Sequence, residues 1–309
     1  MSTLLLTHSA CLDHLMPHGH PERPDRLRAI ERVLEHEKFA TLVREQAPSA
    51  ELETIALCHP RDYVEQIRDA APREGMVRLD ADTSMSPGTF EAALRAVGGA
   101  VRAVEEVMTG TAGNAFVAVR PPGHHAETAV PMGFCLFNNA AIAARYAQRR
   151  HGAERVAIID FDVHHGNGSQ DIFWADASVM YCSTHQMPLY PGTGAVSERG
   201  EHDTIVNAPL APGDGGPEFR EAVETAILPR LEAFRPDLMI ISAGFDAHMR
   251  DPLANLNLTE SDFGWATRKI MEIADRSAGG RVVSVLEGGY DLEGLARSVA
   301  AHVTALMHG

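Results

Sequence analysis

Four short apolar runs, each followed at once by a glycine-bearing polar segment, constrain the fold of this chain more than any other feature. They are AFVAV (115–119) before RPPGHH, RVAIID (155–160) before FDVHHGNG, DLMIISA (237–243) before GFDAH, and RVVSVLE (281–287) before GGYD. Helical patterns separate these runs, and near-continuously apolar strands that alternate with helices indicate a parallel sheet covered on both faces. Because sites in such sheets form outside the carboxyl ends of the strands, we expect the four polar segments to converge at one edge.

The rest of the chain continues this alternation and predicts an α/β fold. Segments 3–7 and 53–58 predict further strands, and the stretch 186–217, rich in Gly and Pro, predicts a long surface loop. Helices are predicted at 23–39, 60–71, 87–108, 138–150, 218–234, 259–276 and 292–306. Thr259 with Asp262 three residues later resembles a capping box. No repeat or charged linker divides the chain, so we predict one domain over residues 1–309.

Composition narrows the partners and the compartment. A formal net charge of −15 disfavours direct nucleic-acid binding. No apolar segment approaches the roughly 18 residues of a membrane span, and the first residues lack the basic and apolar regions of a cleaved signal peptide. The 4 cysteines show no metal-binding or disulfide spacing. These features predict a cytoplasmic protein with reduced thiols.

The segment DFDVHHGNG (160–168) holds the first candidates for chemistry. In an extended chain Asp160, Asp162 and His164 share one face, and the last two are suited to grip one metal ion. Asp and His are common in loops, so this pair alone leaves a structural role open. Asp246, after another strand, is a candidate third ligand. Two carboxylates and one imidazole leave a divalent ion almost neutral with an open position, which suits catalytic zinc.

A zinc-activated water needs a base to take its proton and a donor for the developing oxyanion. His124 and His125 are candidates for the base, although two loop histidines bonded to the backbone are an equally simple interpretation. Tyr290 is a candidate donor, since the two glycines before it allow a sharp turn that brings the phenol close. A purely structural tyrosine remains open.

Taken together, these motifs resemble the histone deacetylase family, specifically its class II branch and the bacterial deacetylase-like and acetylpolyamine amidohydrolase relatives. The matching segments, in order, are HPERPDRL (20–27), RPPGHHAE (120–127), GFCLFNN (133–139), DFDVHHGNGSQ (160–170), YPGTG (190–194), SAGFDAHMRDPL (242–253) and LEGGY (286–290). The resemblance implies the arginase/deacetylase fold, with a largely parallel eight-stranded sheet and helices on both faces.

The resemblance also assigns roles within the site. It implies one catalytic zinc ion per chain, with the ligands Asp162, His164 and Asp246. It makes His125 the general base, with His124 beside it as an electrostatic partner oriented by Asp160. It makes Tyr290 the group that polarises the amide carbonyl and stabilises the oxyanion.

A structural potassium site is a further implication of the resemblance. Its residues are Asp160, through the side chain, Asp162 and His164, through backbone carbonyls, and Ser183 and Thr184 at the end of the next strand. His165 becomes a scaffold residue, because no step of the mechanism requires it.

Asn167 carries the class II character, since the class I branch has an aspartate there that faces the second histidine. An asparagine orients the imidazole but adds no negative charge. We therefore expect a lowered pKa for His125, which keeps it neutral and ready as a base near pH 7.

The family's acyl-lysine channel is narrow and apolar, and its matching positions here are Phe134 and Tyr190, with Gly133 keeping it open. Polyamine-specialised members place a glutamate where this chain has Leu253. Leucine offers no partner for a distant ammonium, so an acetyl-lysine-like substrate is favoured.

Three functions stay in contention. The first is a zinc-dependent amidohydrolase that acts on N-acyl-lysine-like amines, in a peptide or a small molecule. The second is an acetylpolyamine or other small-molecule amidohydrolase, since Asp80 or Asp82 could supply negative charge at the rim. The third is a non-catalytic protein that binds acetylated amines.

The resemblance places Arg26 along an interior route for released acetate. The sequence predicts no oligomeric state.

Overall fold

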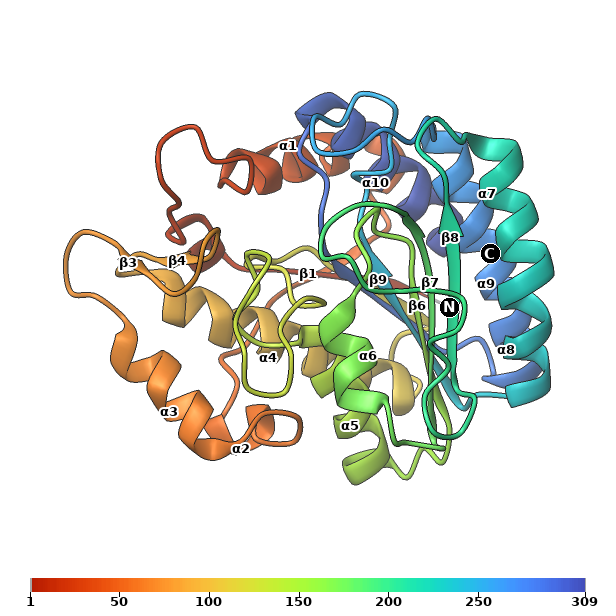
Figure 1. Ribbon diagram of the computed structural model, residues 1–309, viewed down its shortest axis with the longest axis horizontal. Coiled ribbons are helices and arrows are strands. Elements are labelled where there is room, and N and C mark those ends of the chain that lie inside the picture. The colour runs from red at the N-terminus through yellow and green to blue at the C-terminus, as the bar shows by residue number, and fades with distance from the viewer. Residues whose placement is uncertain (1, 309) are drawn as a thin grey trace.

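In the computed structural model, which describes residues 2–308, eight strands form one central parallel sheet (Figure 1). The strands are β1 (Thr3–Thr7), β2 (Val43–Gln46), β5 (Asn114–Val117), β6 (Val156–Asp160), β7 (Val179–Gln186), β8 (Ile205–Leu210), β9 (Leu238–Ala243) and β10 (Val282–Leu286). Their order is β2-β1-β5-β10-β9-β6-β7-β8, and every neighbouring pair is parallel. β3 (Val77–Arg78) and β4 (Ser84–Met85) form a separate antiparallel pair. The predicted α/β architecture is confirmed.

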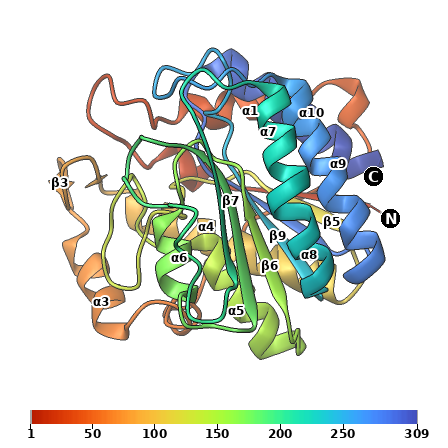
Figure 2. The ribbon, with the colours of Figure 1, turned by 45° about the vertical axis from the view of Figure 1, so that its right-hand side comes forward.

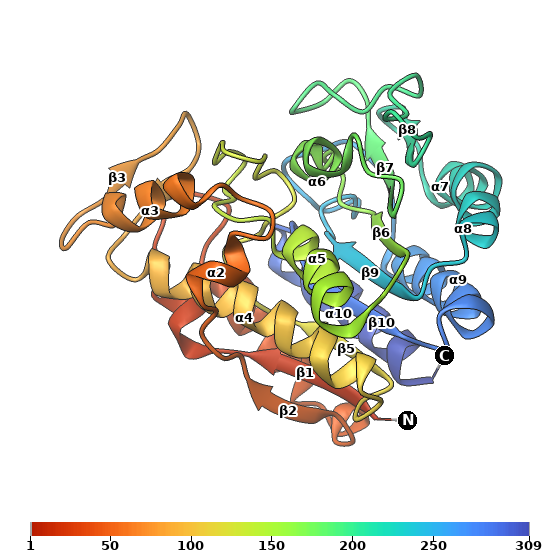
Figure 3. The same cartoon turned by 90° about the horizontal axis from the view of Figure 1, so that it is seen from below.

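Helices cover both faces of this sheet, as Figures 2 and 3 show. The helices of the described residues are α1 (Asp25–Leu34), α2 (Leu52–Ile55), α3 (Arg61–Ala70), α4 (Thr89–Met108), α5 (Asn139–His151), α6 (Asn167–Phe173), α7 (Gly216–Ala222), α8 (Leu228–Phe234), α9 (Glu260–Ser277) and α10 (Leu292–His308). α4 and α5 pack together on one face, while α1, α9 and α10 pack on the other. This double cover explains why every residue of β6, β9 and β10 is buried and why these strands are apolar without alternation. In the part of the chain that the structure describes, no helix combines the length and apolarity needed to cross a membrane.

Some predicted elements differ from the structure. Segment 53–58 is not a strand: it begins within α2 and continues as a turn, and its buried residues Ile55 and Cys58 have the spacing of a helical turn. The helix predicted at 23–39 ends at Leu34, and a 3₁₀ turn over Glu37–Phe39 follows. The helix predicted at 218–234 consists of α7 and α8 joined by a π-helical turn.

Three strands of the central sheet, and the short pair β3 and β4, are not predicted from the sequence. β2 is largely exposed and polar, and β8 lies within the stretch 186–217 that we predict as loop. Both are edge strands, which carry the weakest hydrophobic signal, and β8 contains Pro209, which an edge tolerates. β7 is buried throughout. From the sequence, only its Ser183 and Thr184 are expected, as the end of a strand at the potassium site, and no bounds for the strand are predicted.

A buried charge network joins the N-terminal segment to the strand ends. Glu22, Arg26 and Arg120 are all 0% exposed. Glu22 accepts hydrogen bonds from Nη1 of Arg26 at 3.1 Å and from Nη2 of Arg120 at 2.6 Å. Arg26 also donates from Nε to the carbonyl of Gly289 at 2.6 Å and from Nη2 to the carbonyl of Glu287. The carboxylate of Glu22 therefore binds two buried guanidinium groups. One of them, that of Arg26, also binds the loop after β10.

Replacing Glu22→Gln should lower the free energy of unfolding by about 3–5 kcal/mol, because two buried guanidinium groups lose their counter-charge. Denaturant unfolding of the purified protein measures this loss. Asp25→Asn is the matched control: its partner Arg28 lies at 2.9 Å, but both side chains are about half exposed, so the change should cost under about 1 kcal/mol. Equal losses in the two variants would contradict a structural role for the buried network.

Candidate active site

The four polar segments singled out by the sequence meet at one edge of the sheet. They follow β5, β10, β9 and β6, which are consecutive neighbours in the strand order. Asp160, the last residue of β6, is the register partner of Ser242 in β9 and of Ser183 in β7. Because all these strands run in the same direction, the loops beyond their carboxyl ends lie side by side. The predicted convergence is confirmed.

Asp162, His164 and Asp246 form a buried cluster at this edge, with one ligand-type atom of each within 4.8 Å of the others. Nδ1 of His164 lies 3.2 Å from Oδ1 of Asp162 and 3.1 Å from Oδ2 of Asp246. The remaining carboxylate oxygens are bound by the backbone: Gly288 donates to Asp162 at 2.8 Å and Val163 donates to Asp246 at 2.8 Å. The three side chains are thus held in place and turned toward a common point.

Two glycines make this close approach possible. A Cβ built at Gly244 would collide with the carboxylate of Asp162, and one at Gly288 would collide with the carboxylates of Asp162 and Asp246. Any other residue at either position would push the cluster apart. The glycines after β9 and β10 are therefore required by contact with the cluster.

The electrostatics of the cluster favour a cation. Burial lowers the pKa of His164, but its bonds to Asp162 and Asp246 outweigh burial and raise that pKa to about 10. Burial and the neighbouring charge of Asp162 raise the pKa of Asp246 to about 6. Two buried carboxylates this close need positive charge between them, and a nitrogen with two hard oxygens is a ligand set that zinc accepts. The residues present therefore fit the predicted metal.

The histidine pair lies beside this cluster, and the two rings are in opposite electrostatic states. Burial opposes protonation of His124, but the charges of Asp160 and Asp162 raise its pKa well above the usual range. Burial, together with the positive charges of His124 and His164, lowers the pKa of His125 well below it. Environments that push two pKa values apart are typical of acid–base sites. Here they make His125 the neutral member of the pair.

Hydrogen bonds also select the tautomer of His125. Its Nδ1 lies 2.8 Å from Oδ1 of Asn167, while the amide nitrogen of Asn167 donates to Oε1 of Glu127 at 2.8 Å. Because the amide oxygen only accepts, Nδ1 carries the proton and Nε2 keeps its lone pair. Asn167 thus orients His125 as predicted from its chemistry, and Glu127, which the sequence reasoning omits, orients Asn167.

Glu287 is a second residue that the sequence reasoning misses. It is 0% exposed and accepts hydrogen bonds from the backbone of Gly123 at 2.7 Å and of His124 at 3.1 Å, and from the hydroxyl of Ser242 at 3.1 Å. It therefore fastens the histidine loop to β9 and β10. One feature of the sequence could have revealed it: Glu287 ends the otherwise apolar run RVVSVLE. A carboxylate that is buried at such a position needs a hydrogen-bond or charge partner.

Asp160 is the hub of a further set of contacts. Its Oδ2 accepts from Nδ1 of His124 at 2.9 Å and from the hydroxyl of Tyr181 at 3.0 Å, and its Oδ1 accepts from the backbone of Asp162 at 3.1 Å. Ser183 is its register partner and Thr184 follows in β7, both buried. The residues predicted for the potassium site are therefore adjacent.

His165 makes its hydrogen bonds outside the set of residues that contact Asp160. Its Nδ1 bonds to the hydroxyl of Thr193 at 2.7 Å, and its Nε2 bonds to Oε1 of Gln170 at 3.1 Å. These contacts fasten the loop that carries Tyr190 to α6.

A cavity of about 290 Å³ opens onto the histidine and the metal-type cluster. Its lining consists of Asp82, His125, Gly133, Phe134, His164, Leu189, Tyr190, Leu253 and Tyr290. The rings of Phe134 and Tyr290 lie 5.9 Å apart, and those of His125 and Tyr190 lie 5.2 Å apart. A Cβ at Gly133 would collide with the ring of His125. The four residues predicted for the channel therefore share one cavity, with Asp82 at its wall.

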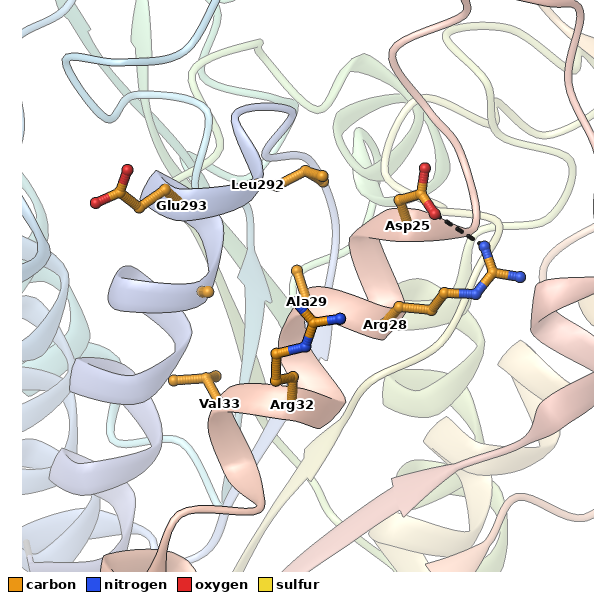
Figure 4. A pocket seen from close by; sticks show the side chains of 8 residues that line it. Asp25, Arg28, Ala29, Arg32, Val33, Leu292 and Glu293 are labelled. Atoms are coloured by element: carbon orange, nitrogen blue, oxygen red, sulfur yellow. Dashed lines mark hydrogen bonds and ion pairs between the residues drawn. The ribbon is translucent and has the colours of Figure 1, made fainter.

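A larger hollow, of about 490 Å³, lies elsewhere, between α1 and α10 (Figure 4). Its lining is Asp25, Arg28, Ala29, Arg32, Val33, Leu292, Glu293 and Ala296. Asp25 and Arg28 pair with one another across part of this surface, as the dashed line in Figure 4 shows. None of the predicted site residues lines this hollow. Although it is the larger of the two, we do not assign it to the candidate active site.

Known proteins share both the sequence and the fold. Residues 20–306 match the histone deacetylase domain. The chain is 41% identical over 313 residues to histone deacetylase 10, chloroplastic, of Oryza sativa subsp. japonica, covering 94% of this chain and 71% of that protein. It is 40% identical over 277 residues to the histone deacetylase-like amidohydrolase of Pseudomonas aeruginosa, covering 88% and 73%. The solved HDA15 HD domain matches with a TM-score of 0.94 and 36% identity over 99% of this chain and 88% of that one.

These matches extend over nearly the whole chain and include every segment that forms the buried edge, which confirms the resemblance found in the sequence. The protein belongs to the histone deacetylase family and is a hydrolase of that family.

Proposed function

We propose that this protein is a single-domain, zinc-dependent amidohydrolase that removes an acetyl or other acyl group from a lysine-like amine. One observation carries the proposal. His125, Tyr290 and the cluster residue His164 come from three different strand ends, yet all line one cavity of about 290 Å³. A tyrosine, a neutral histidine and a cluster suited to a cation around one small space would supply an oxyanion donor, a base and a Lewis-acid site for amide hydrolysis.

The cluster of Asp162, His164 and Asp246 would hold zinc, and Asp160 with the adjacent backbone would hold the structural potassium ion. Zinc in this position would supply a Lewis acid that activates water and polarises the acyl carbonyl. Burial of all three ligands supports this assignment, since a dry site strengthens their hold on a cation.

His125 would take the proton from the attacking water through Nε2, the nitrogen that its bond to Asn167 leaves free. The protonated His124, fixed by Asp160, would stay in place as a positive charge beside the reacting carbonyl and would oppose early protonation of its neighbour. Afterwards His125 would return the proton to the leaving amine.

Tyr290 would donate its phenolic hydrogen to the developing oxyanion. Burial raises the pKa of the phenol well above its usual range; the charge of Arg26 opposes this shift and the nearby acids add to it, so the hydroxyl keeps its proton. The guanidinium of Arg26 lies 4.9 Å from the centre of the ring. A protonated hydroxyl held in place before substrate binds would meet the condition for oxyanion stabilisation.

The lining of the cavity supports an acyl-lysine substrate. Phe134 and Tyr190 offer aromatic walls to a chain of methylene groups, and Leu253 offers only apolar contact. One observation favours the alternative, an acetylated polyamine: the carboxylate of Asp82 also lines the cavity and would attract a second ammonium group.

Free, buried thiols at all 4 cysteines support the further proposal that the protein works in a reducing compartment such as the cytoplasm.

A panel of substrates tests the function directly. We expect acetate release from an acetyl-lysine peptide with a higher kcat/KM than from acetylputrescine, because Leu253 gives a distant ammonium no counter-charge. Longer acyl-lysines and simple acetamides complete the panel. A higher kcat/KM for acetylputrescine would establish the polyamine alternative, and tight binding without turnover by the zinc-loaded protein would contradict hydrolysis altogether.

Metal content separates the ligands from the base. Asp246→Ala should lose zinc, since the cluster is left with one carboxylate and one imidazole. His125→Ala should retain close to one zinc ion per chain and lose acetate release, because its ring bonds to Asn167 and is not one of the three proposed ligands. Metal analysis and a turnover assay on the same samples check both. Substantial activity in His125→Ala would refute the assignment of the base.

The pH profile reports on Asn167. In Asn167→Asp, a carboxylate close to Nδ1 stabilises the imidazolium and raises the pKa of His125. Only the neutral ring accepts a proton, so the acidic limb of kcat/KM should move to higher pH than in the wild type. An acidic limb that stays in place, or moves to lower pH, is incompatible with His125 as the base.

A further inference from the structure

The loop that carries Tyr290 is held at three successive residues. The backbone N–H of Gly288 donates to Asp162 at 2.8 Å, and the carbonyl of Gly289 accepts from Arg26 at 2.6 Å. The backbone N–H of Tyr290 then donates to Oδ2 of Asp251 at 2.7 Å. The third bond is the one at the tyrosine itself, and it comes from a residue that the proposed mechanism does not use.

Asp251 accepts more than this bond. Its Oδ2 also accepts the backbone N–H of Asp291 at 3.2 Å, and its Oδ1 accepts that of Leu253 at 3.0 Å. The residue is only 8% exposed. One buried carboxylate therefore joins the loop after β9, where Leu253 lines the cavity, to the loop after β10, where Tyr290 lines it.

The loop needs such an anchor because glycine precedes the tyrosine. Gly289 has a φ of +119°, and a Cβ there would press against Leu295 and Phe245, so a stiffer residue is excluded. Glycine leaves the backbone free to pivot just before Tyr290. The hydrogen bond from the backbone N–H of Tyr290 to Asp251 restrains the backbone directly after this glycine.

The start of α10 does not explain the position of Asp251. Asp291 caps that helix with its own side chain, which accepts the N–H of Gly294 at 2.7 Å and pairs with Arg250 at 2.9 Å. The helix is thus anchored by other groups, while the shortest bond of Asp251 goes to the tyrosine.

Asparagine cannot reproduce these bonds although it has the same shape. A carboxylate accepts through both oxygens, whereas an amide offers one oxygen and an NH₂ group that only donates. With its oxygen toward Tyr290, the amide would set NH₂ against the N–H of Leu253. Turned the other way, it would set NH₂ against the N–H of Tyr290. Either choice disrupts one of the two joined loops.

We propose that Asp251 is a positioning residue for the reaction, which places the Tyr290 hydroxyl over the substrate carbonyl and links it to the channel wall at Leu253. This inference rests on the proposed role of Tyr290 as oxyanion donor. It requires that Asp251 act through Tyr290, so replacing Asp251 should not lower kcat further once the Tyr290 hydroxyl is absent.

A double-mutant cycle on the zinc-loaded enzyme tests this. Tyr290→Phe should lower kcat by ~10²–10³, the scale for one lost oxyanion donor. Asp251→Asn should lower kcat by up to about 10², the scale for a catalytic group displaced by roughly 1 Å, with a smaller change in KM. In the Tyr290→Phe background, Asp251→Asn should cause no further loss, because the hydroxyl that it positions is already absent.

Asp291→Asn is the matched control. It removes one negative charge next to Tyr290, but asparagine caps a helix as well as aspartate does, so kcat should stay at the wild-type value. Metal analysis and thermal unfolding of each variant allow turnover to be expressed per folded, zinc-loaded chain. If Asp251→Asn does not fold, Asp251→Ser takes its place in the same cycle with the same expected non-additivity.

The outcomes separate the two proposals. A wild type without turnover, or a Tyr290→Phe variant as active as the wild type, overturns the proposed function. If both of those expectations hold but Asp251→Asn keeps the wild-type kcat, the positioning role is overturned. It is also overturned if the losses of the two single variants multiply in full, since a merely structural residue would act independently of the phenol.

Discussion

Several carboxylates are buried at one edge of a sheet that is covered on both faces, and this constraint governs the rest of the structure. Asp160, Asp162, Asp246 and Glu287 are all at most 1% exposed, and they lie within a few residues of the ends of three adjacent strands. Like charges in a medium of low polarity repel strongly, so each needs a donor or a cation. The backbone N–H groups, the histidines and the proposed zinc ion together meet this requirement.

This compensation also fixes the geometry of the proposed site. Asp160 and Asp162 keep His124 charged, and the charge of His124 helps to keep His125 neutral. Glu287 binds the backbone of the histidine loop, while Asp162 binds the backbone of Gly288. The groups that neutralise the acids are therefore the groups that the proposed reaction uses, or their immediate neighbours. Such an arrangement is preorganised, because little has to move when charge develops on the substrate.

Glycine is the second recurring requirement, for a steric reason. The acids approach each other so closely that Gly244 and Gly288 leave no room for a Cβ. Open backbone of this kind is mobile unless other bonds restrain it, which is why the loop before Tyr290 is tied to Arg26, Asp162 and Asp251. Arg26 itself depends on Glu22, so a buried ion pair far along the sequence contributes to the position of the phenol.

The sequence by itself determined the class of fold and most of the residues at the site. The inner strands β6, β9 and β10 are apolar on both faces, so their pattern is visible without knowledge of their neighbours. The inner strand β7 is equally buried, but its second half, STHQ, is polar and hides the pattern. The site residues follow these strands directly, so strand direction alone brings them to one edge. Edge strands β2 and β8 and the short helix α2 carry no comparable signal, because their pairing or packing is decided by distant parts of the chain. Only the tertiary structure could reveal the buried or partly buried acids that hold the proposed site together, namely Glu22, Glu127, Asp251 and Glu287. The partners of these acids lie in other segments, and a buried carboxylate cannot be told from an exposed one until the groups that donate to it are brought close in space.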